Sequence, residues 1–344
     1  MQRILVLEED LAAQVEERTA GNPLFAVQLV ADWVQRGVLE PGPVGFRLRA
    51  GMQAPLPDDL HQVWHERMRR ILAELPPTDT VAVQLAAVLG QEVDDRDWRE
   101  ACTRAGVVPS SALLERLHAE RLVATTERGG EIGWAFAHGM LRETNERLAQ
   151  EAGRLPSLHA ICAAMLAERG LPILDERIGR HLLDAGKPED AIAPLLRGAT
   201  QRREHGEFRH AELLLNEREE ALRALEVPED DARWVQGWVL QASLEVERHR
   251  LDRAEALATR AHQVAASKGW GQLDGWARHV LGRIACLEGN LDRAFEHLGK
   301  AARHARRAGD RQLAAACHAG QGMAHLLENK LDDAAEFCRR ARQE

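Results

Sequence analysis

The chain has 344 residues, of which 45% are hydrophobic and 29% charged, so it is long enough for two or three packed globular domains. Its net charge of −9 argues against non-specific nucleic-acid binding, which needs a basic surface. No apolar stretch reaches the roughly 18 residues that a transmembrane helix needs, and the apolar residues 4–7 are too few for a signal peptide.

The five cysteines lie far apart, at positions 102, 162, 286, 317 and 338. No two of them have the spacing of a metal site, and a disulfide framework would be denser. We therefore expect reduced thiols in a cytoplasmic protein.

The first predicted elements are two short helices separated by a Gly-Asn-Pro break. Residues 11–18 have helical apolar spacing, and Gly21, Asn22 and Pro23 interrupt it. Asn22 can cap the next helix and Pro23 suits its first turn, so we expect a helix over residues 24–35 that ends at Gly37. A turn and a short strand follow over residues 42–49.

A second block of helices ends in a β-hairpin. Helices are expected from Pro57 to about residue 74 and over residues 78–89, 98–105 and 110–120. Residues 122–126 and 132–136 flank Gly129 and Gly130, which is typical of a hairpin. Helices followed by a hairpin predict a winged-helix arrangement. Acidic residues outnumber arginines in this block and lysine is absent, so a packing role is favoured over DNA binding.

Beyond residue 136 the sequence predicts helices only, with an internal repeat. One turn pattern recurs before Ala211, Ala254, Ala294 and Ala334, and the last three alanines are 40 residues apart. Small residues stand 12 positions before three of these alanines, at Ala242, Gly282 and Gly322. A small residue lets the paired helix approach, so we predict a solenoid of helical hairpins that bury their apolar faces by stacking. The last repeat is expected to be incomplete.

Several segments resemble, in order, consecutive parts of the STAND signalling ATPases. Residues 19–39 resemble the GNPLF lid helix of that family, and residues 56–67 and 86–93 resemble the start of its winged-helix domain. Residues 136–143, FAHGMLRE, resemble the closing element of that domain, and residues 158–168 and 178–225 resemble its first repeats. Together they span nearly the whole chain, and residues 33–38 and 138–142 are most similar to kinase-linked bacterial members.

The resemblance implies a nucleotide-dependent switch whose ATPase core is missing here. In that family the lid proline packs on adenine and a histidine near the end of the winged helix senses the β-phosphate; by position these are Pro23 and His138. The chain has no G-x-x-x-x-G-K-[ST] motif and no kinase motifs, so we expect no ATP hydrolysis and no cofactor in this chain. The alternative is that Gly21–Pro23 is only a helix cap, and His138 a hydrogen-bonded histidine at a strand-to-helix junction.

The repeat region offers few candidate site residues. Trp234 and Trp238 are one helical turn apart and so share a helix face. We expect them either to pack in the core or to line a partner-binding groove. His205, His210 and the later histidines form no HExxH pair, so they do not predict a zinc site.

The predicted fold is mainly α, with a winged-helix domain followed by a TPR-like α-solenoid and one small β-hairpin. We expect a lid remnant over residues 1–50, a winged-helix domain over 51–150 and TPR-like repeats over 151–344. The predicted function is a non-catalytic regulatory and protein-interaction module of a kinase-linked STAND ATPase. It would bind a protein or small ligand on the concave solenoid face, with an ATPase core acting in cis or in trans. The alternatives are a free-standing TPR scaffold and, with less support, a DNA-binding regulator.

Overall fold

The fold is described from a computed structural model, which covers residues 7–8, 11–12, 15–16, 23–35, 37–42, 45–49, 60–128 and 131–344. Its contacts divide the chain into two compact units, Met1–Met165 and Leu166–Glu344. The three-part division expected from the sequence stays a prediction.

The first unit begins with a helix and a small sheet. Helix α2 (Pro23–Gln35) buries Leu29 and Trp33, and the strands β1 (Leu39–Pro41) and β2 (Phe46–Leu48) pair antiparallel. Gly21 and Asn22 of the lid-like motif lie outside the described residues, and Pro23 is the first residue of α2.

Five helices and a three-stranded antiparallel sheet follow among the described residues between 60 and 151 of this unit. The strands β3 (Glu92–Asp94), β4 (Val123–Arg128) and β5 (Glu131–Phe136) have the spatial order β3-β5-β4. The helices are α3 (Leu60–Ala73), α4 (Pro77–Leu89), α5 (Asp95–Arg104), α6 (Ser111–Ala119) and α7 (Gly139–Glu151). The hairpin β4–β5 lies where the sequence predicts it, whereas β1 and β3 were not predicted. The name winged helix for this arrangement stays a prediction.

Aromatic packing joins the sheet to the helices. The ring of Trp98 on α5 meets Trp134 on β5 edge-on at 5.4 Å between centroids, and Trp134 meets Phe136 at 5.2 Å. The indole Nε1 of Trp98 donates to the carbonyl oxygen of Ala82 at 2.7 Å, so its only polar atom is satisfied inside the core. These contacts join α5 to β5 and to α4.

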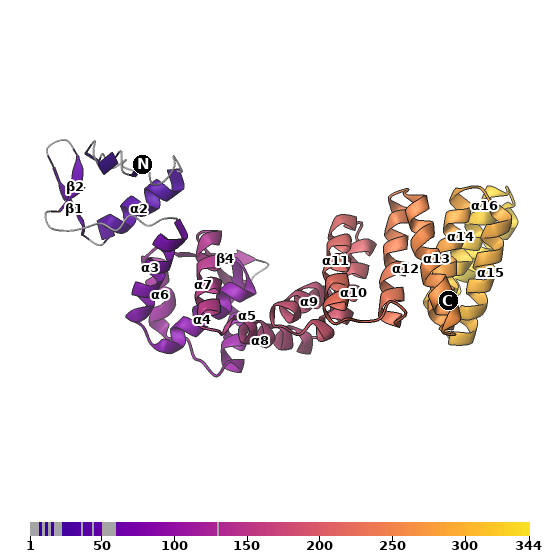
Figure 1. Cartoon of the computed structure of the whole chain (residues 1–344), viewed down its shortest axis with the longest axis horizontal. Coiled ribbons are helices and arrows are strands. Elements are labelled where there is room, and N and C mark those ends of the chain that lie inside the picture. Colours follow the sequence, from indigo (N-terminus) through magenta and orange to yellow (C-terminus); the bar gives the residue numbers. More distant parts are fainter. Residues whose placement is uncertain are drawn as a thin grey trace. The chain divides into compact units, whose positions relative to one another are not determined.

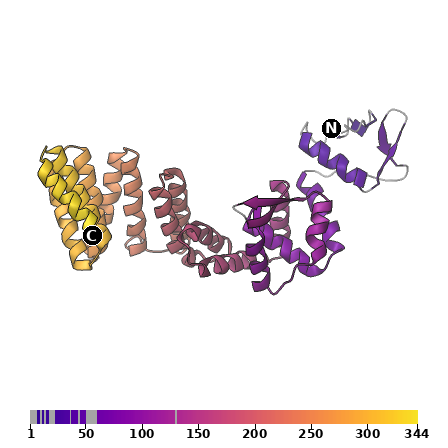
Figure 2. The ribbon, with the colours of Figure 1, turned by 180° about the vertical axis from the view of Figure 1, so that it is seen from behind.

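The second unit is helical throughout, as the sequence predicts. It follows α8 (Leu155–Glu168), which crosses the boundary between the units, and a short 3₁₀ turn at Pro172–Leu174. Its helices stand side by side in chain order (Figures 1 and 2). They are α9 (Asp175–Asp184), α10 (Pro188–Glu204), α11 (Phe208–Ala224), α12 (Ala232–Glu247), α13 (Leu251–Ser267), α14 (Gly271–Leu287), α15 (Leu291–Ala308), α16 (Arg311–Leu327) and α17 (Leu331–Gln343).

The small residues predicted at the hairpin seams lie at close helix contacts. A Cβ atom at Gly282 would stand 2.6 Å from Cγ of Leu298, and one at Gly322 would stand 3.2 Å from Sγ of Cys338. A Cβ atom at Gly179 would stand 2.7 Å from Cδ2 of Leu195. In all three pairs the second residue comes 16 positions after the glycine. The repeated contact confirms a solenoid of helical hairpins of the TPR-like kind.

Turns between consecutive helices of the second unit hold a left-handed residue. The φ angle is +70° at Gly186, +77° at Gly206, +58° at His249, +76° at Gly289 and +63° at Asn329. This conformation costs a residue with a side chain more than it costs glycine. His249 is therefore the least suited residue of the set, since asparagine tolerates the left-handed region better.

Replacing His249 with glycine is expected to stabilise the second unit by about 1 kcal/mol, because it removes the cost of a left-handed histidine. The exchange Gly289→His at the equivalent turn should destabilise it by a similar amount. Urea denaturation followed by circular dichroism measures both. Equal stability of H249G and the wild type would show that the turn carries no such strain.

Candidate functional site

Alternate helices of the repeats form one side of the solenoid. Helices α12, α14 and α16 pack on one another as well as on their hairpin partners. In a helical-hairpin solenoid, the helices that make these additional contacts form the inner layer, whose surface is the usual place for a binding groove. These helices therefore carry the candidate site.

A hollow of about 340 Å³ lies between α14 and α16. We call it the α14–α16 groove. Gly320 lies where a Cβ atom would stand 2.9 Å from Cδ2 of Leu298 on the neighbouring α15, so a larger residue there would have to displace that side chain. Leu287 and Met323 are about half exposed, at 53% and 52%. The lining residues are His279, Arg283, Cys286, Leu287, Ala316, Ala319, Gly320 and Met323.

The floor of the groove is uncharged at neutral pH. Burial, aided by the nearby charge of Arg283, lowers the pKa of His279 to about 3, so its imidazole is neutral. Burial also raises the pKa of Cys286, which keeps the thiol protonated. The guanidinium of Arg283 is paired with Glu247 at 2.9 Å. The groove thus offers apolar surface with one compensated charge at its edge.

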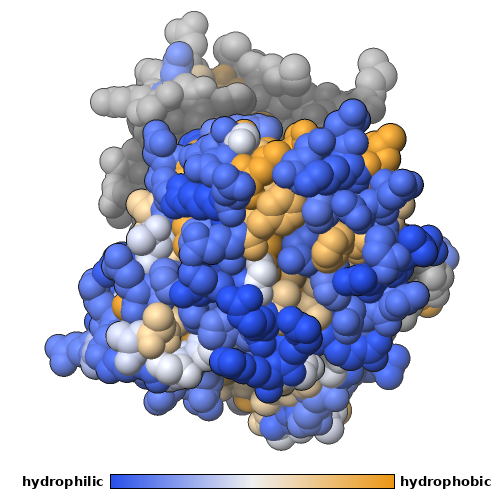
Figure 3. Space-filling model, turned by 90° about the vertical axis from the view of Figure 1, so that its right-hand side faces the viewer, coloured by the Kyte–Doolittle hydropathy of each residue, from blue (hydrophilic) through white to orange (hydrophobic). Residues whose placement is uncertain are grey.

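The apolar surface continues along α16. Leu326 and Leu327 are 51% and 53% exposed, and they lie one helical turn beyond Met323. When the repeats are aligned at their spacing of 40 residues, Met323, Leu326 and Leu327 correspond to Arg283, Cys286 and Leu287 of α14. Figure 3 views the chain from its C-terminal end and shows apolar side chains gathered among hydrophilic ones there.

A half-buried aspartate at the start of α16 holds the two walls of the groove together. Asp310 accepts hydrogen bonds from the backbone N–H of Leu313 at 2.9 Å, and from Gln272 at 2.8 Å and Trp276 at 3.1 Å on α14. Burial raises its pKa, but these hydrogen bonds outweigh that effect and lower the pKa below its usual value. Asp310 therefore caps α16 and ties its first turn to α14.

Trp234 and Trp238 lie in the core of the solenoid. Their side chains are stacked at 6.1 Å between ring centroids and are 5% and 3% exposed. The indole of Trp234 donates to the carbonyl oxygen of Val227 at 3.0 Å, and the guanidinium of Arg260 covers Trp238 at 4.1 Å. This placement favours the packing role over partner binding.

The two residues expected to contact nucleotide lie in the first unit. His138 directly precedes α7, is half-buried, and its ring lies 5.9 Å from that of Trp64. Pro23 begins α2, and its side chain is outside the described part of the structure. Their nucleotide-sensing roles stay predictions.

Metal and membrane features are not found among the described residues. No group of three or more histidine, cysteine or acidic side chains in that part of the chain could hold a metal ion. Asp274 instead pairs with His262 at 2.5 Å, His304 at 3.1 Å and Arg278 at 3.1 Å, and so joins α13, α14 and α15.

Within the described residues, no helix combines the length and the apolar character that crossing a bilayer requires.

No protein-family model matches the chain, and no curated protein matches it. Several solved structures resemble it at low identity. The first is BtubC (BKLC) from P. vanneervenii, with 16% identity and a TM-score of 0.42 over 57% of this chain and 84% of that one. The second is a STAND protein with a tetratricopeptide repeat sensor from Pyrococcus horikoshii, with 13% identity and a TM-score of 0.35 over 97% of this chain and 56% of that one. The third is the TPR domain of P58(IPK), with 13% identity and a TM-score of 0.27 over 83% of each chain. Likenesses this weak carry no functional argument.

Proposed function

We propose that this chain is a protein-interaction module that binds an extended or helical peptide of a partner in the α14–α16 groove. The observation that carries the proposal is the apolar, half-exposed surface of Leu287 and Met323 beside an uncharged floor. Half-exposed large apolar side chains around a hollow are typical of a recognition site. The preferred partner segment carries apolar side chains, because the groove has no unpaired charge to attract an acidic or basic one.

A finer proposal places the module in a STAND-type signalling ATPase linked to a protein kinase. The order of the lid-like, winged-helix-like and repeat-like segments in the sequence supports it. In this proposal the chain is non-catalytic and cytoplasmic and holds no cofactor itself. Pro23 and His138 would contact ATP or ADP held by an ATPase core in cis or in trans. Partner binding would then shift the switch between two states, which requires a partner that prefers one of them.

The alternative of a free-standing scaffold uses the same groove but no nucleotide. The two proposals differ in what an added ATPase core would do. The test mixes this chain with the P-loop domain of a related switch protein. If the mixture binds ADP more tightly than the P-loop domain alone, and the gain depends on His138 of this chain, the switch proposal is supported. If His138→Ala changes nothing, the scaffold proposal is favoured.

The groove proposal is tested by peptide display on the full chain. Peptides selected on the wild type should be rich in apolar residues and should lose at least about tenfold in affinity for the double variant L287D/M323D, because each aspartate places a charge against apolar ligand surface.

Leu213 provides the matched control, because it is 51% exposed on α11, away from the groove. The variant Leu213→Asp should bind the selected peptides as the wild type does. Equal loss of binding in L213D, or unchanged binding in L287D/M323D, would place the interaction elsewhere.

A further inference from the structure

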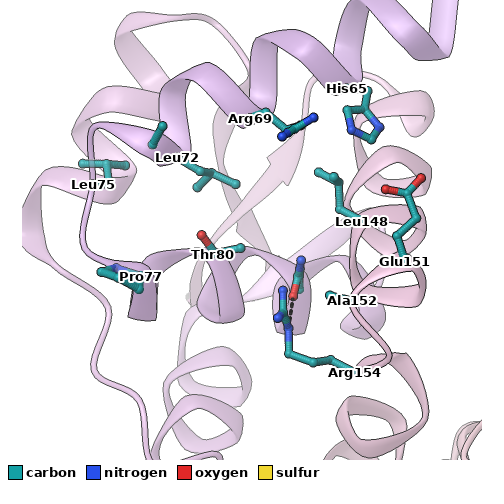
Figure 4. Close-up of a pocket in the computed structure, with 12 residues that line it drawn as sticks. His65, Arg69, Leu72, Leu75, Pro77, Thr80, Leu148, Glu151, Ala152 and Arg154 are labelled. Atoms are coloured by element: carbon teal, nitrogen blue, oxygen red, sulfur yellow. Dashed lines mark hydrogen bonds between the residues drawn. The ribbon is translucent and has the colours of Figure 1, made fainter.

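A second hollow, of about 670 Å³, lies in the first unit between α3, α4 and α7. Figure 4 shows His65 and Arg69 on α3 opposite Leu148 and Glu151 on α7, with Arg154 below them. We call it the α3–α7 cleft, and its volume is in the range of small-molecule sites. Its apolar surface comes from Leu72, Ala73, Leu75, Pro77, Leu148 and Ala152.

A buried amide in this cleft lacks a hydrogen-bond acceptor. Gln84 on α4 is 1% exposed, and its Oε1 accepts a hydrogen bond from Nε of Arg154 at 3.1 Å, drawn as a dashed line in Figure 4. That bond fixes the orientation of the amide, since a guanidinium can only donate. The amide nitrogen Nε2 is left without a partner among the described residues. Buried amide groups are normally satisfied, so an acceptor is missing at this point.

The charges around the cleft favour an anion. Arg69 and Arg154 contribute two guanidinium groups and His65 an imidazole, against the single carboxylate of Glu151. Arg69 is exposed and makes no ion pair with any residue that the structure describes. The local excess of positive charge contrasts with the net charge of −9 of the whole chain.

We propose that the α3–α7 cleft binds a small amphiphilic carboxylate. The carboxylate accepts hydrogen bonds from Gln84 Nε2 and from the guanidinium of Arg69, which is the residue type suited to a planar anion. The apolar tail of the ligand covers Leu72, Leu75 and Leu148. The proposal is independent of the α14–α16 groove, because the two sites lie in different units.

The test uses hexanoate as the probe and the full chain with methyl-labelled leucines. Hexanoate should shift the methyl resonances of Leu72, Leu75 and Leu148 saturably, with a midpoint of about 1 mM or lower. Hexanol, which has the tail without the charge, and acetate, which has the charge without the tail, should each bind at least about tenfold more weakly.

Two variants separate the cleft from general charge effects. Arg69→Met should weaken hexanoate binding about tenfold and leave hexanol binding unchanged, because it removes only the contact with the carboxylate. Arg147→Met removes an equal charge from an exposed position of α7 that does not line the cleft, and should change nothing. The proposal is overturned if hexanol binds as well as hexanoate, if R147M acts like R69M, or if the leucine methyl shifts do not saturate.

Discussion

Replacing Arg218 with alanine is expected to destabilise the second unit by about 3–5 kcal/mol. Arg218 on α11 is fully buried, and its guanidinium donates to the carbonyl oxygen of Ile192 on α10 at 3.2 Å and of Arg233 on α12 at 2.6 Å. Burial lowers its pKa to about 10, which still leaves it charged at neutral pH. Alanine would leave a cavity and remove the two hydrogen bonds that tie α11 to carbonyl oxygens of α10 and α12. Urea denaturation followed by circular dichroism measures the loss.

Two further variants serve as controls for the Arg218→Ala measurement. Arg223→Ala removes an exposed arginine from the same helix that pairs with Glu219 and lies 5.8 Å from the centroid of the Trp234 ring, and should cost no more than about 1 kcal/mol. Arg218→Met fills the space without donating, so its loss should be about half that of alanine. If R218A stays within about 1 kcal/mol of the wild type, the joint between α11 and α12 does not depend on this side chain.

The second large effect is expected at Gly282, where alanine should destabilise the solenoid by about 1–3 kcal/mol. The new Cβ atom would stand 2.6 Å from Cγ of Leu298, which is fully buried and also lies against Gly320. Alanine is a better helix former than glycine by about 1 kcal/mol, so a net loss means that the steric cost is larger than this gain. Thermal and urea denaturation of G282A measure the balance.

Gly299 on α15 is the matched control for that substitution. The nearest atom to a Cβ at this position is Nη1 of Arg303 at 3.9 Å, so alanine fits without strain. Gly299→Ala should therefore stabilise the unit by about 0.5–1 kcal/mol through helix propensity alone. If Gly282→Ala also stabilises the second unit, then the close contact between α14 and α15 does not require glycine at position 282.

The repeat architecture could be predicted because its signals are local and periodic. The turn pattern before Ala254, Ala294 and Ala334 and the small residues at Gly282 and Gly322 recur at fixed spacing, and the structure places each of them at a turn or a helix seam. The strand Glu92–Asp94 was missed, because three residues with two charges show no strand pattern. It becomes a strand only through pairing with Glu131–Phe136, some 40 residues away.

The candidate site was harder to predict than the fold. The spacing of Trp234 and Trp238 shows that they share a helix face, but both faces of a solenoid helix are apolar, and periodicity does not tell which one is buried. The groove residue Met323 could have been suspected by aligning α16 with α14, because it is an apolar residue at the position that Arg283 has in α14. The contact of Gln84 with Arg154 joins residues 70 apart and has no sequence signal.

The central claim, that the chain acts through the α14–α16 groove, is tested most directly by mapping a selected peptide on the full chain with methyl-labelled leucine, methionine and alanine. The account predicts that saturating peptide shifts the methyl resonances of Leu287, Ala319 and Met323, and that those of Leu213 stay unchanged. Shifts that avoid these three residues while the peptide is bound would contradict it.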